Sequence, residues 1–196
     1  MKVLKINSSA AKKTSISRSE VDAVISKLLT RYPNAEIIER DVAYSNLPFP
    51  DDKLVEAIFQ SGELNEEQQK AAKLSDILVD EFMGSDILVI GAPMYNFGIP
   101  ASLKAYFDLI ARAGRTFQYN EHGYPVGLVE DKKTIVIITT GGVPLGSPMD
   151  FSKNYIATFL GFLGIRDIEY LELDENRFKY EEKRKAASEK LDSILN

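Results

Sequence analysis

Two short apolar runs, DILVIGA at residues 86–92 and KTIVIITT at residues 133–140, constrain the fold of this chain more than any other feature. Both are rich in β-branched residues, have the length of a strand and are bounded by turn residues. Strands that are almost continuously hydrophobic are typical of parallel sheets, in which helices cover both faces. We therefore expect the chain to fold around a central parallel sheet.

Three further segments have strand character, at residues 2–7, 35–41 and 168–174, and the last of them alternates like a half-buried edge strand. Segments with helical periodicity separate the strands. These are residues 18–32, 65–82, 102–114, 150–163 and 177–195. Strands that alternate with helices predict right-handed crossovers and helices on both sides of one sheet.

Two helix starts carry capping patterns. Ser17 is followed three residues later by Glu20, which is a capping-box spacing, and Asn65 stands in the same relation to Gln68. We expect these residues to fix the N-termini of the helices over 18–32 and 65–82.

Two segments lie outside the strand–helix alternation. Residues 42–64 form an irregular excursion in which a short helix is expected around Leu54–Gln60. In residues 116–129 two strand-like pieces flank Asn120–Gly123, which predicts a hairpin. The complete pattern predicts an α/β protein: a flavodoxin-like, three-layer, doubly wound, five-stranded parallel sheet in one domain over residues 1–196, with a small hairpin inserted after the helix that follows strand three.

Composition excludes several classes of partner. The 24 Lys and Arg residues against 29 Asp and Glu give a net charge of −5 with no basic stripe, so no nucleic-acid partner is expected. The absence of cysteine excludes disulfides and thiolate chemistry and fits a cytoplasmic location. No apolar run approaches the roughly 20 residues of a membrane span, so no membrane partner is expected.

Ligands of open α/β sheets bind outside the carboxyl ends of the strands, where three loops meet in this chain. The first loop, SSAAKKTSIS at residues 8–17, lacks the glycine motifs of dinucleotide and triphosphate sites. It is rich in hydroxyls and ends at a helix N-terminus, which suits a phosphate monoester. A polar loop with an ordinary helix cap is the alternative.

The other two loops suit a flat heteroaromatic ring. PMYNFG at residues 93–98 combines methionine, aromatic and amide side chains, although a turn with an exposed aromatic residue is an alternative. In TTGGVPLG at residues 139–146, the pair Gly141-Gly142 either forms a tight turn or lets backbone N–H groups approach a ligand. Together the three loops predict a flavin mononucleotide (FMN) site.

Hydrolytic and metal chemistry have little support. The single histidine, His122, lies at the expected hairpin tip with no serine nucleophile motif, and no cluster has metal-ligand spacing. The scarcity of acid–base residues instead indicates that a bound cofactor carries redox chemistry.

Several motifs together are specific for one family. These are PMYNF followed by SLKAYFDLIARAG, the loop with Ser9 and Ser15–Ser17, GLV before a Lys-Lys strand, and TFLGFLGI at residues 158–165. Over essentially its whole length the chain resembles the FMN-dependent NADH-azoreductases, also described as NADH:quinone oxidoreductases of the flavodoxin-like superfamily. The resemblance implies a homodimer with one FMN per subunit at the dimer interface.

The resemblance also implies which residues bind the cofactor and what they do. The phosphate would be held by Ser9, Ser15, Ile16 and Ser17, and the isoalloxazine ring by Met94, Tyr95, Asn96, Phe97, Thr139, Thr140, Gly141 and Gly142. The flavin itself would carry the reaction, so no catalytic side chain is assigned. Candidates for the walls of the substrate pocket are Phe59, Phe117 and Tyr119, the last two with a hairpin core as the alternative.

The implied reaction is ping-pong: NADH gives a hydride to the flavin and leaves, and a quinone or azo compound then takes two electrons on the same ring face. One departure from some members of the family is Thr140, where those members carry arginine. Nothing in the residues themselves decides between NADH and NADPH.

A flavodoxin-type electron carrier without substrate turnover is the main alternative. The aromatic hairpin at 116–129 argues against it. So does the apolar helix over 102–113, whose Leu103, Tyr106, Phe107 and Ile110 exceed what one sheet face requires and could form a dimer seam.

Overall fold

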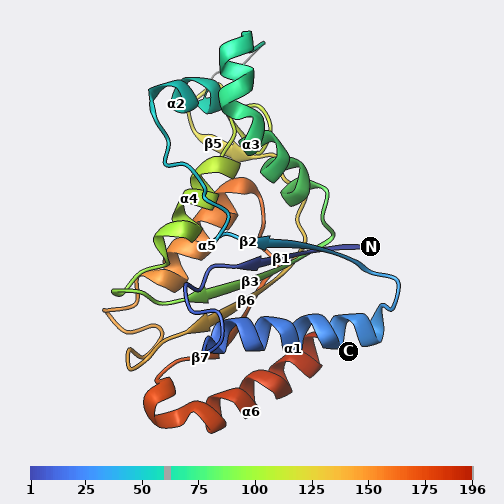
Figure 1. Ribbon diagram of the computed structural model, residues 1–196, viewed down its shortest axis with the longest axis vertical. Helices are drawn as coiled ribbons and strands as arrows, with labels where there is room; N and C mark the ends of the chain where they lie inside the picture. Colours follow the sequence, from blue (N-terminus) through green and yellow to red (C-terminus); the bar gives the residue numbers. More distant parts are fainter. Residues whose placement is uncertain (60–62, 196) are drawn as a thin grey trace.

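A computed structural model of the protein describes residues 1–59 and 63–195 (Figure 1). Its centre is a five-stranded sheet in the order β2-β1-β3-β6-β7, in which every neighbouring pair is parallel. The strands are β1 (Lys2–Asn7), β2 (Glu36–Asp41), β3 (Ile87–Pro93), β6 (Lys133–Thr139) and β7 (Ile168–Leu173). This strand order confirms the predicted flavodoxin-like sheet.

Helices cover both faces of the sheet and so make three layers. Figure 1 shows α1 (Ile16–Arg31) and α6 (Asn176–Leu195) together on one face. On the other side lie α2 (Asp52–Phe59), α3 (Glu66–Met83), α4 (Ala101–Ile110) and α5 (Ser152–Leu163). Gln60, where the predicted short helix was to end, lies outside the described residues.

The two apolar runs are continuous because alternate residues enter different cores. Leu88 and Ile90 of β3 pack into the cluster under α2 to α5, whereas Val89 between them packs into the cluster under α1 and α6. All three side chains are fully buried. The same division in β6 explains why neither strand shows the polar–apolar alternation of an exposed sheet.

The first helix begins earlier than its sequence predicts. Ser15 is the N-cap, accepting a hydrogen bond from the backbone N–H of Arg18 at 3.2 Å, so the predicted capping box of Ser17 and Glu20 is wrong. Ser17 lies inside the first turn, and Glu20 accepts a hydrogen bond from Arg184 instead. The second capping prediction is confirmed in full, because Asn65 and Gln68 exchange side-chain hydrogen bonds with each other's backbone N–H.

The fourth helix ends at Ile110, four residues before the predicted Gly114. The hydroxyl of Thr116 donates to the Ile110 carbonyl at 2.7 Å and accepts from the Arg112 N–H at 2.8 Å. These bonds give partners to backbone groups at the end of the helix, so the helix stops before Gly114. The predicted hairpin follows, as β4 (Phe117–Tyr119) paired antiparallel with β5 (Pro125–Gly127).

The predicted dimer seam on α4 is wrong. Leu103, Tyr106, Phe107 and Ile110 are all completely buried within the chain. Phe107 stacks on Phe159 of α5 with ring centroids 4.3 Å apart. The extra apolar surface of α4 exists because this helix packs on the sheet and on α5 and contacts α3 as well. In the described part of the chain, no helix is both long and apolar enough to cross a bilayer.

Candidate functional site

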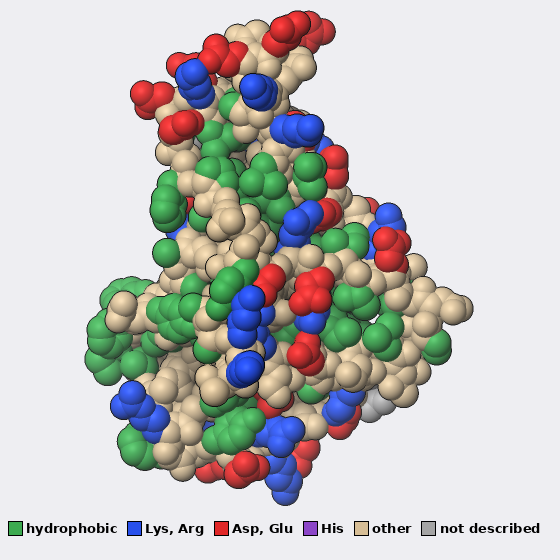
Figure 2. Space-filling view, in the orientation of Figure 1, with side chains coloured by type: hydrophobic (Ala, Val, Ile, Leu, Met, Phe, Trp, Pro, Cys, Tyr) green, Lys and Arg blue, Asp and Glu red, His purple; other side chains and the backbone are tan. Residues whose placement is uncertain are grey.

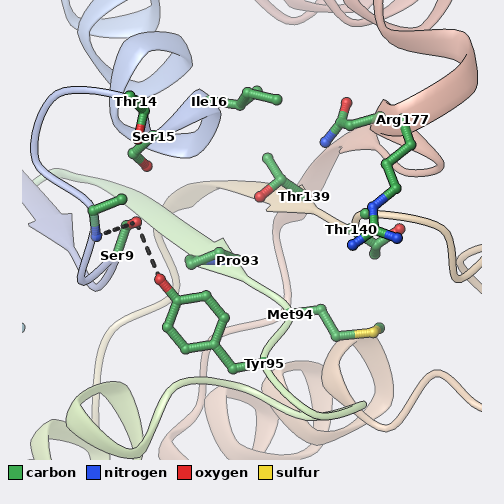
Figure 3. Close-up of a pocket in the computed structure, with 13 residues that line it drawn as sticks. Ser9, Thr14, Ser15, Ile16, Pro93, Met94, Tyr95, Thr139, Thr140 and Arg177 are labelled. Atoms are coloured by element: carbon green, nitrogen blue, oxygen red, sulfur yellow. Dashed lines mark hydrogen bonds between the residues drawn. The ribbon is translucent and has the colours of Figure 1, made fainter.

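A cleft of about 350 Å³ opens at the carboxyl ends of β1, β3 and β6, within the range of about 300–1,000 Å³ common for small-molecule sites (Figure 3). The strand order reverses here: β1 and β3 are neighbours in the sheet, but the chain continues from them in opposite directions, to β2 and to β6. Ligands of open α/β sheets usually bind at such a point. The cleft is lined by Ser9, Ala11, Thr14, Ser15, Ile16, Pro93, Met94, Tyr95, Thr139, Thr140, Gly141, Asn176 and Arg177. The three predicted loops therefore converge on one cleft.

One end of the cleft is the N-terminus of α1. The hydroxyls of Ser15 and Ser17 lie 3.1 Å apart, and no acidic residue stands in the first turn. Within the described chain, the backbone N–H groups of Ile16 and Ser17 have no protein acceptor. Ser17 is buried and does not line the cleft, so it offers an anion its N–H rather than its side chain. Free N–H groups, hydroxyls and the helix dipole suit this end of the cleft, here called the anion subsite, to an anionic group.

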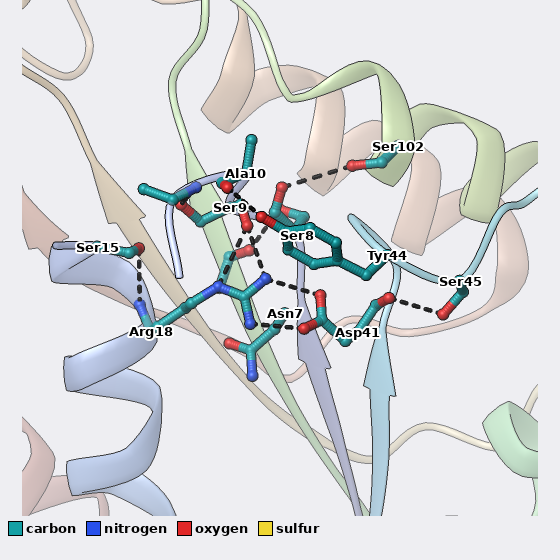
Figure 4. A network of polar contacts seen from close by, with 12 residues as sticks. Asn7, Ser8, Ser9, Ala10, Ser15, Arg18, Asp41, Tyr44, Ser45 and Ser102 are labelled. Atoms are coloured by element: carbon teal, nitrogen blue, oxygen red, sulfur yellow. Dashed lines mark hydrogen bonds and ion pairs between the residues drawn. The ribbon is translucent and has the colours of Figure 1, made fainter. Parts of the chain in front are cut away.

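An arginine fixes the shape of the first loop (Figure 4). Arg18 pairs with both oxygens of Asp41, at 2.8 and 2.7 Å, and its Nη2 and Nε donate to the Ser9 carbonyl at 2.6 and 3.1 Å. The pKa of Arg18 is raised, chiefly by its hydrogen bonds to Asp41. Because its charge is taken up by Asp41, Arg18 shapes the loop rather than serving as the free cation of the cleft.

Tyr44 holds the same loop from outside. Its hydroxyl donates to the Ala10 carbonyl at 2.5 Å, and the ammonium of Lys12 lies 3.9 Å from the centre of its ring. No local sequence pattern predicts this role for Tyr44 or for Asp41. It depends on β2 lying beside β1, with Asp41 opposite Asn7 in the parallel register.

Tyr95 joins the second loop to the first. Its hydroxyl accepts a hydrogen bond from the Ala10 N–H at 3.1 Å and lies 3.3 Å from the hydroxyl of Ser9 (Figure 3). Ser9 also accepts from the Ala11 N–H at 3.3 Å. The aromatic ring of Tyr95 therefore runs along one wall of the cleft while its hydroxyl reaches the anion end.

The second loop contains a strained turn. Tyr95 and Gly98 exchange two backbone hydrogen bonds, and the residues between them, Asn96 and Phe97, have φ of 49° and 73°. Asparagine tolerates this left-handed region, whereas phenylalanine rarely occupies it. Such strain is typical of binding sites. The Phe97 carbonyl accepts from the Phe151 N–H at 3.1 Å, which helps to hold the turn.

Asn96 and Phe97 lie just outside the cleft lining. Asn96 instead lines an adjoining groove of about 570 Å³ that shares Tyr95 with the cleft and is also bounded by Phe151 and Tyr155. Phe97 is 50% exposed. Of the predicted ring-binding residues of this loop, Met94 and Tyr95 thus line the cleft, Asn96 lines the groove and Phe97 lines neither.

The third loop is braced by β7 and the start of α6. Thr140 donates to the Val143 carbonyl at 2.5 Å and accepts from the Glu175 N–H at 3.1 Å. Asp174 accepts from the Leu145 N–H at 3.0 Å; burial opposes its ionisation, yet hydrogen bonds from Lys183 and this N–H keep its pKa below the usual value. Thr139 and Gly141 line the cleft, whereas Gly142 does not.

Arg177 is a cleft residue that sequence reasoning missed. It belongs to the first turn of α6, where its N–H donates to the Gly141 carbonyl at 3.1 Å. It is the one charged residue in the described lining. No local pattern marks it, because it reaches the third loop only through the pairing of β7 with β6.

Two of the three candidate substrate residues, Phe117 and Tyr119, do not line the cleft of their own chain. Phe117 is buried and packs on Phe162 of α5 at 4.6 Å, so it belongs to the hairpin core. Tyr119 is 60% exposed on the hairpin, and the side chain of Phe59 lies outside the described part of the structure. His122 is exposed at the hairpin tip, and no metal-binding cluster of His, Cys, Asp or Glu occurs in the described residues.

Comparison with known proteins agrees with this geometry. The sequence profile of a family described as having a flavodoxin-like fold matches residues 1–195. A relative from Hahella chejuensis, named FMN-dependent NADH:quinone oxidoreductase 1, is 43% identical over 174 residues, which are 88% of this chain and 84% of the relative. A relative of the same activity name from Thiobacillus denitrificans is 39% identical over 196 residues, covering 100% of this chain and 95% of the relative.

Solved structures give the same result. An azoreductase from Bacillus anthracis superposes with a TM-score of 0.88 at 29% identity, covering 100% of this chain and 98% of that one. An FMN-dependent NADH-azoreductase from the same species, solved in complex with FMN, has a TM-score of 0.79 at 26% identity and covers 100% and 99%. This chain therefore belongs to the flavodoxin-like family of FMN-dependent NADH:quinone oxidoreductases and azoreductases.

Proposed function

We propose that this protein binds FMN in the cleft and uses NADH to reduce quinones and aromatic azo compounds by two electrons. One observation supports the proposal most strongly: three features lie in the same cleft. They are the anion subsite at the start of α1, an apolar wall, and the backbone of Gly141, which no side chain covers. The anion subsite would bind the phosphate of FMN, the apolar wall would contact the face of the ring, and the backbone of Gly141 would contact its edge.

The lining fits a cofactor-dependent reaction. Its described residues supply hydroxyls, an amide, a thioether and one guanidinium, but no carboxylate or histidine. When bound, FMN supplies the redox chemistry that such side chains lack. The role of this chain is to hold the phosphate at Ser9 and Ser15–Ser17 and to orient the ring between residues 94–97 and 139–142.

The enzyme is favoured over a flavodoxin-type electron carrier by the activity names of relatives about 40% identical. Steady-state kinetics of the FMN-loaded protein test it. With NADH varied at several fixed quinone concentrations, the double-reciprocal lines should be parallel, as expected when both substrates use one ring face in turn. Failure to oxidise NADH in the presence of FMN and quinone would contradict the proposal.

A homodimer is part of the proposal. Large apolar side chains are exposed beside the cleft, at Phe97, Met149 and Phe151, and Figure 2 shows apolar side chains gathered at the edge of the molecule where these loops lie. A patch of this kind is typical of an interface. The exposed aromatics Tyr119 and Tyr124, which do not line their own cleft, would be available to the cleft of a second copy.

Phe151→Asp should convert the dimer to a monomer. Phe151 is 66% exposed, so a charge there leaves the folded subunit intact but would be buried without a partner in the interface. Analytical ultracentrifugation at micromolar concentration measures the change, with Phe49→Asp as the control because Phe49 is 75% exposed and outside the cleft and adjoining groove. A Phe151→Asp variant that sediments like the parent would argue against this interface.

Asn96→Gly should weaken FMN binding about tenfold, since one or two ring-edge hydrogen bonds are each worth about 1 kcal/mol. Glycine accepts the positive φ of this position, so the turn itself is kept. Fluorescence titration of the apoprotein with FMN gives the affinity, and thermal unfolding of the apoprotein is the control for folding. Unchanged affinity would remove Asn96 from the ring site.

We infer a cytoplasmic location as part of the same proposal. The chain has no cysteine, so it has no disulfide that would require an oxidising compartment.

A further inference from the structure

The guanidinium of Arg177 lies at the end of the cleft opposite the anion subsite. Figure 3 shows its side chain extending from the start of α6 toward Thr140, across the cleft from Ser9 and Ser15. Its Nε is 3.5 Å from the point that a side-chain carbon on Gly141 would occupy. Because position 141 is glycine, no side chain stands between the guanidinium and the backbone of the third loop.

The neighbouring carboxylates do not neutralise this charge. Glu175, two residues before Arg177, is paired with Lys179 at 2.9 Å, and Asp174 is paired with Lys183 at 2.7 Å. Within the described residues, the Arg177 guanidinium has no hydrogen-bond or ion-pair partner. Two lysines of the same helix thus occupy the acids that would otherwise bind it, which leaves a full positive charge facing the cleft.

A cation in this position is matched to charge that develops on the ring. A hydride carries two electrons and one proton, so its transfer to the neutral isoalloxazine gives a reduced ring with one negative charge unless a second proton follows. The phosphate already has its own subsite at the other end of the cleft. The charge that remains to be balanced at the Gly141 end is that of the reduced ring.

We propose that Arg177 stabilises the negative charge of the reduced flavin and thereby raises the reduction potential of the bound cofactor. The inference rests on the proposed function, because it takes the ring to lie between residues 94–97 and 139–142. In this proposal the first turn of α6 does more than begin a helix, because its arginine changes the reduction potential of the flavin. Oxidised FMN, whose ring is neutral, gains little from this residue.

The test compares Arg177→Gln with Arg177→Lys, using the FMN affinity of the apoprotein and the two-electron potential of the FMN-loaded protein. In Arg177→Gln, the affinity for oxidised FMN should change less than threefold. The affinity for reduced FMN should fall about tenfold, which corresponds to a potential about 30 mV lower for a two-electron couple. Arg177→Lys keeps the charge and should recover most of the potential.

Lys185→Gln is the matched control. Lys185 lies on the same helix, is 80% exposed and does not line the cleft, so its loss removes one positive charge without touching the site. Its potential should equal that of the parent. Equal shifts in both glutamine variants would indicate a general effect of net charge and would overturn the proposal.

Two other results would also overturn it. An unchanged potential in Arg177→Gln means that the guanidinium does not interact with the reduced ring. If the potential of Arg177→Gln is unchanged and its KM for NADH is also raised, Arg177 binds the diphosphate of the dinucleotide instead of acting on the flavin. If the parent protein binds no FMN at all, the proposed function fails first, and that result is distinct because it appears before any variant is compared.

Discussion

Replacing Phe107 with alanine is expected to lower the free energy of unfolding by about 3–5 kcal/mol, the usual cost of removing a fully buried aromatic side chain. Phe107 has no exposed surface. Its ring is stacked on Phe159 at 4.3 Å with 12° between the planes, and Tyr155 and Tyr106 lie at 6.2 and 6.3 Å. Truncation would therefore remove both buried apolar area and aromatic contacts at the centre of the α4–α5 packing.

Urea denaturation of the apoprotein measures this loss. Phe178→Ala is the control, because Phe178 is 79% exposed and its removal should change stability by less than about 0.5 kcal/mol. The experiment also separates two roles for α4. If Phe107 formed a seam between subunits, its replacement would shift the oligomer toward monomers while the subunit kept its stability. Such a result would contradict the packing described above.

Ser15→Asp is expected to reduce FMN affinity by about two to three orders of magnitude. A carboxylate about 4 Å from a phosphate costs roughly 4 kcal/mol per unit charge in a partly exposed site, and each 1.4 kcal/mol is tenfold in affinity. Ser15 is the N-cap of α1, and aspartate caps helices as well as serine does. The fold should therefore survive a change that repels the phosphate.

Riboflavin provides the internal control for Ser15→Asp, because it carries the same ring without the phosphate. Its weaker binding should be nearly equal in the variant and the parent, whereas FMN binding should differ greatly. Isothermal titration of the apoprotein with each ligand measures both. A Ser15→Asp protein that keeps its preference for FMN over riboflavin would place the phosphate away from the start of α1.

The sheet was predictable from the sequence because strands that are buried on both faces consist mostly of apolar residues. The central runs of β3 (residues 87–90) and β6 (residues 135–138) are continuously apolar since each face of the sheet meets a separate core, and the hairpin is marked by Asn120 and Gly123. The end of α4 was not predictable, because the cap comes from Thr116 beyond the helix rather than from Gly114. Local patterns cannot report a hydrogen bond made by a side chain that the pattern assigns to the next segment.

The candidate site was predictable loop by loop but not contact by contact. The three loops follow strand ends, so their convergence depends only on strand order. Three contacts of the site join segments that are distant in sequence. They are the contact of the Tyr95 hydroxyl with Ser9, the ion pair of Arg18 with Asp41, and the approach of Arg177 to Gly141. These contacts depend on strand register and side-chain reach, which periodicity and composition do not encode.

Anaerobic addition of NADH to the FMN-loaded protein tests whether this protein reduces its bound flavin by two electrons. One equivalent of NADH should bleach the flavin absorbance completely in a single two-electron step, and one equivalent of quinone should then restore it. We expect no lasting one-electron-reduced flavin at any point in the titration. Flavin that stays oxidised in excess NADH, or that stops at the one-electron level, would contradict reduction by two electrons.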